Sequence, residues 1–248
     1  MQSGYVAMLD VLGFSGLVRG GDQTERKFGD YLTCVQNATK DIRVAYVVFS
    51  DTMVLTTEGG EAESLLTMAQ ACSRLFHDLL KVEIPIRGAI AFGNFFRSTV
   101  ADSVFVAGSS VLDAFWFEQQ QDWVGVMLAP SARVRVPDLA DRCKLQFPTS
   151  VEFQRRVEWA AVIQHCDSIP FHNEVNAFDG FAVVPRKCKP DAADLFSSIK
   201  DAEKRLEWLR DIAPSPASQR KYRAALQWLS KIPADWRGIA DLREQGLL

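Results

Sequence analysis

Two aspartates occupy positions at which carboxylates often do chemistry. Asp10 follows residues 5–9, a run that is apolar at every position and is typical of a central strand covered on both faces. Asp51 lies between two β-prone runs, 44–49 and 52–57, and therefore at the tip of an expected hairpin. If the hairpin pairs with the first strand, the two carboxylates meet at one end of the sheet.

Two neighbouring carboxylates repel each other, and a cation between them removes that repulsion. Oxygen ligands suit Mg²⁺ or Mn²⁺, and a pair of such ions can hold both the attacking oxygen and the phosphates in phosphoryl transfer. The turn and helix start formed by Leu12, Gly13, Phe14 and Ser15 offer backbone N–H groups to a polyphosphate. A lone aspartate at either position is more often a turn or cap residue, so the prediction rests on the pair.

The elements that position these residues alternate between strand and helix patterns. The expected strands cover 5–9, 44–49, 52–57, 84–92, 123–128 and 178–184. The expected helices include apolar stripes at 28–35, 65–79 and 108–120, with a further helical turn at Pro130. Gly93 and Asn94 indicate the end of the fourth strand. This order predicts an α+β fold with a ferredoxin-like βαββαβ core and added strands.

The composition changes after about Lys189. Two amphipathic stripes, 195–209 and 222–229, lie on either side of a break at Pro214 and Pro216. We expect residues 1–188 to form the main domain. Residues 189–248 then form a C-terminal helical extension that packs on the core or on a partner subunit.

Composition and charge exclude several classes of function. The net charge of −3 does not favour nucleic acid or an anionic membrane as a partner. Five scattered cysteines without a C-x-x-C pair argue against a disulfide framework and a zinc ribbon. We find no signal peptide and no apolar stretch that would span a bilayer, so we expect a cytoplasmic protein.

Four motifs resemble, in order, those of the class III nucleotidyl cyclases. They read DVLGFS at 10–15, FSDT at 49–52, RGAIAFG at 87–93 and GSSVLDAFWFE at 108–118. The resemblance covers roughly the first 130 residues. It implies a nucleotide cyclase domain in which Asp10, Asp51 and the carbonyl of Val11 bind two Mn²⁺ or Mg²⁺ ions. It also implies a homodimer with active sites at the interface.

The departures from the family motifs are equally informative. The helix motif of the family carries an Asn that orients the ribose and an Arg that stabilises the transition state, and Leu112 and Trp116 stand there. Val47 and Phe105 replace the Lys and the acidic residue that read a purine base. This combination resembles the Pycsar pyrimidine cyclases of bacterial antiphage defence. It implies conversion of UTP to 3′,5′-cyclic UMP and pyrophosphate, with a separate effector that responds to the product.

Within this resemblance, Arg97 is the expected catalytic replacement for the missing helix arginine, and Arg133 is the alternative. Tyr46 and Arg87 are the expected further contacts to the substrate. Tyr46 also suits a core aromatic, and Arg87 suits a structural ion pair. Three other functions stay open: a cytidylate cyclase, an adenylyl or guanylyl cyclase with an unusual base pocket, and a non-catalytic nucleotide-sensing dimerisation module.

Overall fold

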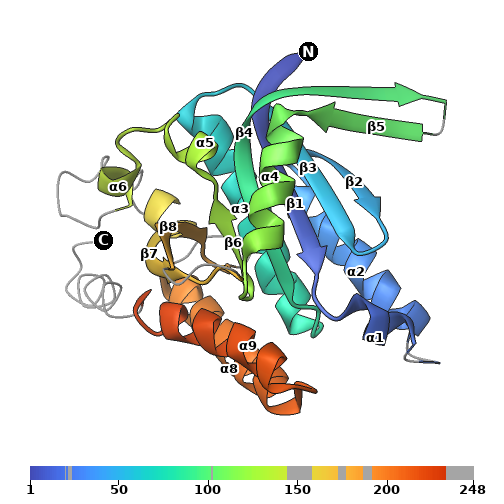
Figure 1. The fold of residues 1–248 in the computed structure, drawn as a ribbon, viewed down its shortest axis with the longest axis vertical. Coiled ribbons are helices and arrows are strands. Elements are labelled where there is room, and N and C mark those ends of the chain that lie inside the picture. Colours follow the sequence, from blue (N-terminus) through green and yellow to red (C-terminus); the bar gives the residue numbers. More distant parts are fainter. Residues whose placement is uncertain are drawn as a thin grey trace.

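One mixed β-sheet forms the centre of the protein in the computed structural model (Figure 1), which describes residues 1–19, 21, 24–101, 103–143, 158–172, 177–186 and 192–232. The strands are β1 (Gln2–Val11), β2 (Ala45–Phe49), β3 (Thr52–Glu58), β4 (Ile86–Val100), β5 (Ser103–Gly108), β6 (Gly125–Leu128), β7 (Ile163–Ile169) and β8 (Phe178–Val183). Their order is β2-β3-β1-β4-β6-β8-β7, and β5 pairs with the outer part of β4.

The first four strands form the predicted ferredoxin-like core. β1 lies between β3 and β4 and is antiparallel to both. The hairpin partner β2 forms the edge beside β3. Among the described strands, the only parallel pairing joins β4 to β6, where the added strands begin. This arrangement confirms the predicted α+β fold class.

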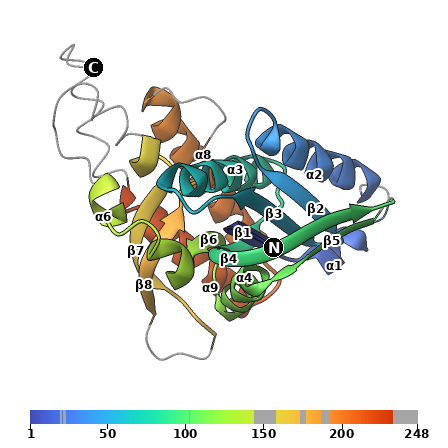
Figure 2. The same ribbon diagram turned by 90° about the horizontal axis from the view of Figure 1, so that it is seen from above.

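Helices cover both faces of the sheet. They are α1 (Phe14–Val18), α2 (Thr24–Thr39), α3 (Ala62–Lys81), α4 (Ser109–Gln120), α5 (Pro130–Arg133), α6 (Leu139–Arg142), α8 (Ala192–Ile212) and α9 (Pro216–Leu229). Figure 2 shows α2, α3 and α8 on one face of the sheet and α4 on the other. Within β1, Tyr5 and Leu9 belong to the core cluster that contains α2 and α3, whereas Val6 packs with α4. Burial on both faces explains why this strand is apolar at successive positions.

The structure corrects one predicted boundary and adds two strands. Gly93 and Asn94 do not end β4, which continues to Val100 and pairs with β5 as an arm that projects from the body of the protein (Figure 1). Gly93 instead lets the backbone of β4 pass close to the start of α4, because a Cβ atom at this position would lie 2.8 Å from the hydroxyl of Ser109. The second added strand is β7, which no pattern in the sequence predicted.

The two C-terminal helices belong to the same hydrophobic core as the sheet. Ser215 caps α9 by accepting a hydrogen bond from the backbone N–H of Ser218 at 3.1 Å. The ring of Trp228 in α9 lies 5.4 Å from that of Trp123, and its indole N–H donates to the carbonyl of His165 at 3.2 Å. The expected boundary between residues 188 and 189 lies outside the described residues.

The cysteines of the described chain behave as buried hydrophobic residues. Cys34, Cys72, Cys143 and Cys166 are buried and unpaired. Within the same described ranges, no helix combines the length and the apolar character needed to cross a membrane.

Replacement of Trp228 by Ala should destabilise the whole protein. Trp228 is 4% exposed, so the substitution removes a buried ring and should lower the free energy of unfolding by about 3–5 kcal/mol. The matched control is Trp208→Ala in α8, where the side chain is 42% exposed. Urea unfolding measures the free energy of unfolding of both variants. Equal losses in Trp228→Ala and Trp208→Ala would show that α9 does not belong to the core.

Candidate active site

The structure brings Asp10 and Asp51 to the same end of the sheet. Asp10 lies opposite Thr52 of β3 and Arg87 of β4. The hairpin turns at Ser50, whose φ of 57° lies in the left-handed region. The backbone N–H of Val11 then donates to the carbonyl of Asp51 at 2.9 Å. This bond ties the hairpin tip to the end of β1 and places both aspartates beside each other.

Arg87 is held by other protein groups beside Asp10. Its guanidinium lies 2.6 Å from the Glu118 carboxylate through Nη2, and Nε donates to the same carboxylate oxygen at 2.8 Å. Nη1 donates to the carbonyl of Gln121 at 2.9 Å and lies 3.3 Å from Nε2 of His172. Asp10 is a more distant partner, at 3.7 Å. This geometry matches the structural ion pair that the sequence analysis left open.

The local charge balance disfavours ionised Asp10. Burial raises the pKa of its carboxyl to about 6, and the negative charges of Glu118 and Asp51 add to the effect. The positive charges of Arg87 and Lys221 oppose it. The carboxylates at this end of the sheet are therefore not fully compensated by protein cations.

Tyr31, which the sequence analysis did not identify as a site residue, places an orphaned hydroxyl near both carboxylates. The residue lies in α2, is 4% exposed, and its buried hydroxyl has no hydrogen-bond partner. Burial, followed by the charges of Asp51 and Asp10, raises the pKa of this phenol. An unpaired buried hydroxyl is unfavourable and calls for an absent partner such as water or an ion.

These groups fit divalent metal ions. In the described part of the chain no group of three or more His, Cys, Asp or Glu side chains is arranged to hold a metal. Asp10 and Asp51 would therefore supply two carboxylates, and main-chain carbonyls such as that of Val11, water or substrate oxygens would supply the rest. Mg²⁺ in particular retains several waters and binds through one or two carboxylates and phosphates.

The turn after Asp10 has the predicted form. Gly13 has a φ of 77°, a left-handed conformation that favours glycine, and it precedes the short helix α1. The N–H of Leu12 is used, since it donates to the carbonyl of Pro85 at 2.9 Å. Among the described residues, the N–H groups of Gly13, Phe14 and Ser15 donate to no backbone carbonyl. Three of the four predicted phosphate donors are thus free for a ligand.

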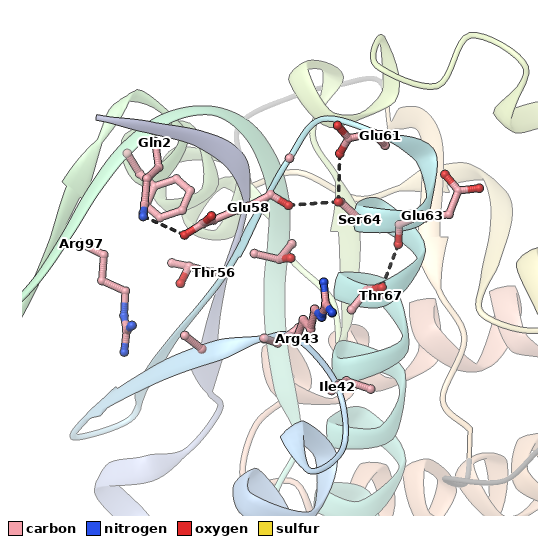
Figure 3. A pocket seen from close by; sticks show the side chains of 15 residues that line it. Gln2, Ile42, Arg43, Thr56, Glu58, Glu61, Glu63, Ser64, Thr67 and Arg97 are labelled. Atoms are coloured by element: carbon pink, nitrogen blue, oxygen red, sulfur yellow. Dashed lines mark hydrogen bonds between the residues drawn. The ribbon is translucent and has the colours of Figure 1, made fainter.

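The structure does not bring Arg97 or Tyr46 to this site within one chain. Arg97 lies ten residues beyond Arg87 on β4, about 33 Å along an extended strand. It lines the pocket of Figure 3, which has a volume of about 920 Å³ and also contains Arg43 and Glu58. Tyr46 pairs with Leu55, which pairs with Ala7. Ala7 and Asp10 are three residues apart on β1, so alternation puts Tyr46 on the sheet face opposite to that of Asp10.

Arg133, the alternative to Arg97, packs against Phe181 of β8. Its guanidinium stacks over the Phe181 ring at 5.3 Å, and it lines a pocket formed with Leu139 and Phe181. Neither arginine is therefore a neighbour of Asp10 in a single chain.

No family model matches the sequence, and no curated protein sequence matches it. Solved structures do. The adenylyl cyclase CyaB from P. aeruginosa is similar with a TM-score of 0.50 and 10% identity, over 77% of this chain and 97% of that chain. The guanylyl cyclase domain of the RhoGC fusion protein from Blastocladiella emersonii gives a TM-score of 0.47 and 15% identity, over 75% and 98% of the two chains. The likeness to CyaB shows that the described chain has the fold of a class III cyclase.

The partly buried position of Asp10 predicts that the metal-free protein is stabilised by Asp10→Asn. Because the folded-state pKa of about 6 lies above the ordinary 3.8, ionisation of Asp10 costs the folded state free energy above pH 6. That cost decreases as the pH falls from 6 towards 3.8. We expect Asp10→Asn to raise the free energy of unfolding in EDTA by about 1–3 kcal/mol at pH 7.5, and by about half as much at pH 5.

The matched control is Asp138→Asn. Asp138 is exposed, and its hydrogen bond to Arg142 at 2.9 Å lowers its pKa, so no stabilisation is expected. Thermal or urea unfolding at the two pH values measures both variants. A variant Asp10→Asn that is less stable than the wild type at pH 7.5 would contradict the charge balance described above.

Proposed function

We propose that this protein is a nucleotide cyclase that converts UTP to 3′,5′-cyclic UMP and pyrophosphate. The observation that carries the proposal is the meeting of Asp10 and Asp51 at the end of β1, with the orphaned hydroxyl of Tyr31 beside them. The fold shared with CyaB supports it, because carboxylates at this position suit an enzyme that handles a metal-bound triphosphate.

In this reaction the ribose 3′-oxygen forms a bond to the α-phosphorus, the bond to the β-phosphate bridging oxygen breaks, and the hydroxyl proton leaves to solvent. Two Mn²⁺ or Mg²⁺ ions, when bound, lower the pKa of the 3′-hydroxyl and compensate charge on the triphosphate. Asp10 and Asp51, with the carbonyl of Val11, would hold these cations. The free N–H groups of Gly13, Phe14 and Ser15 orient the phosphates.

The preference for a pyrimidine rests on side chains that cannot read a purine. Val47 lies on β2 and Phe105 on β5, and neither side chain offers the charged groups that a purine edge would need. Phe105 is 59% exposed and available to an apolar contact with a small base. We extend the proposal to a signalling role in antiphage defence, in which the cyclic nucleotide activates a separate effector in the cytoplasm.

A homodimer would complete the site. Apolar side chains are exposed on α4 and on the β4–β5 arm: Phe96, Val104, Phe105, Leu112, Phe115 and Trp116. Leu112 is 71% and Trp116 50% exposed, values typical of a surface that a partner covers. In this arrangement residues 1–188 form the cyclase domain and residues 189–248 the extension, and Arg97 reaches the active site of the partner chain.

The second candidate function is a non-catalytic nucleotide sensor. The observation that favours it is the absence of Lys and Arg from the described helix α4, where Trp116 stands at the position of the family's Arg and Leu112 at that of its Asn. A sensor would bind nucleotide with metal and release it unchanged.

The protein should convert one pyrimidine triphosphate with Mn²⁺, and Asp51→Ala should lower the rate by at least roughly 10³-fold, because the metal pair loses a ligand. Mass spectrometry of the products from each of the four ribonucleoside triphosphates measures this, with Asp138→Asn as the control. Cyclic CMP would identify a cytidylate cyclase, and a purine product would contradict pyrimidine selection. Metal-dependent binding without turnover would identify the sensor.

Arg97 should act across the dimer. Asp51→Ala and Arg97→Ala should each be inactive alone, and their mixture should regain up to about a quarter of the wild-type activity, since half of the dimers are mixed and one of their two sites is intact. The control mixture pairs Asp10→Ala with Asp51→Ala, which lie in the same half-site and should regain nothing. An active Arg97→Ala variant would remove Arg97 from the mechanism.

A further inference from the structure

The end of the sheet that carries Asp10 has one lysine that the proposed chemistry has not used. Lys221 lies on α9, in the C-terminal extension, and its side chain is 24% exposed. Its ammonium lies 3.6 Å from the carboxylate of Asp122, which follows α4. Its charge is also among those that act on Asp10. The ion pair therefore ties the extension to Asp122, the residue after Gln121, whose carbonyl accepts a hydrogen bond from Arg87 beside Asp10.

A series of polar contacts links Lys221 to Asp10. The same Asp122 oxygen that pairs with Lys221 lies 3.5 Å from Nδ1 of His172. Nε2 of His172 lies 3.3 Å from Arg87, and Arg87 lies 3.7 Å from Asp10. The packing of Trp228 against Trp123 holds α9 in this position.

Lys221 differs from Arg87 in having free donors. Arg87 is 7% exposed, and hydrogen bonds to Glu118 and Gln121 occupy its guanidinium. Lys221 has an ion pair at 3.6 Å but no hydrogen bond to any described residue, so its three N–H donors remain available. A lysine ammonium of this kind binds phosphate as a point charge.

We propose that Lys221 binds the polyphosphate of the nucleotide held at Asp10 and Asp51, so that α9 supplies a substrate-binding residue to the site of its own chain. The inference rests on the proposed function for the identity of the ligand. The surroundings support it: the carboxyl groups of Asp10, Asp51 and Glu118 lie near a single guanidinium, that of Arg87. A triphosphate bound there needs a protein cation in addition to the metal ions.

The test measures binding of inorganic tripolyphosphate and of a non-cyclisable UTP analogue, each with Mn²⁺, by titration calorimetry. Lys221→Met keeps the length of the side chain and removes its charge, and it should weaken both ligands by roughly 10–100-fold. Lys221→Arg should stay within about threefold of the wild type, because it restores the charge. The control is Lys231→Met, which removes an exposed lysine that pairs with Asp167 at 2.9 Å. This variant should bind both ligands with the affinity of the wild type.

A second variant separates phosphate binding from a structural role. Asp122→Asn removes the ion-pair partner and leaves Lys221 in place, so it should keep or increase tripolyphosphate affinity. If Lys221 served only to pair with Asp122, the two variants Asp122→Asn and Lys221→Met would weaken binding equally, and the proposal would be wrong. Normal binding by Lys221→Met would overturn it as well.

The two proposals fail separately. A wild-type protein that makes cyclic nucleotide, with Lys221→Met binding tripolyphosphate normally, would refute the role of Lys221 alone. A wild type that binds the analogue through Lys221 but makes no cyclic product would refute the cyclase and retain the phosphate site.

Discussion

The buried ion pair between Arg87 and Glu118 organises the end of the sheet on which the proposed chemistry depends. It joins β4 to the last turn of α4, and both side chains are almost fully buried. Removal of one partner from such a pair typically costs about 3–5 kcal/mol, because the other charge is left unpaired in a poorly solvated place. The pair also fixes the position of Arg87 relative to Asp10 and His172. Strand, helix and the His172 segment therefore hold one common geometry.

This pairing leaves a deficit of positive charge beside it. Burial, followed by the charge of Glu118, raises the pKa of the Asp10 carboxyl to about 6. Arg87 opposes this shift only from 3.7 Å, because Glu118 and the Gln121 carbonyl take its donors. Asp51 adds a second carboxylate, and the Tyr31 hydroxyl has no partner. Two sources of positive charge would suit this deficit. Divalent ions would lie between the carboxylates, and the ammonium of Lys221, which pairs with Asp122 at 3.6 Å, would add a protein cation. A substrate that carries phosphates and metal together satisfies both.

Local patterns predicted the parts of this site that are close in sequence or joined by a hairpin. The apolar run before Asp10 and the two β-prone runs around Asp51 were sufficient to predict the pairing of β1 with β3. The β4–β5 arm was missed because Gly93 and Asn94 resemble a turn, whereas Gly93 lies there to admit α4. Tyr31 was missed because an aromatic residue at helical spacing is usually core, and only three-dimensional neighbours reveal that its hydroxyl is orphaned. Lys221 is separated from Asp10 by most of the chain, and no local pattern connects them.

If Arg97 acts in catalysis, as proposed, its position requires a site built from two chains. Arg97 lies about 33 Å along β4 from the pair partner of Asp10, which is far beyond the reach of a side chain. In a two-fold symmetric dimer, the same surface of each chain contacts the other chain. The β4–β5 arm, which is too distant from Asp10 of its own chain, can then reach the site of the partner chain. The exposed apolar side chains of α4 and the arm lie on the elements such a contact would cover, and their burial would also exclude water from the reacting phosphate. A cation from α9 of the same chain and one from the arm of the partner would then approach the triphosphate from two elements outside the ferredoxin-like strands.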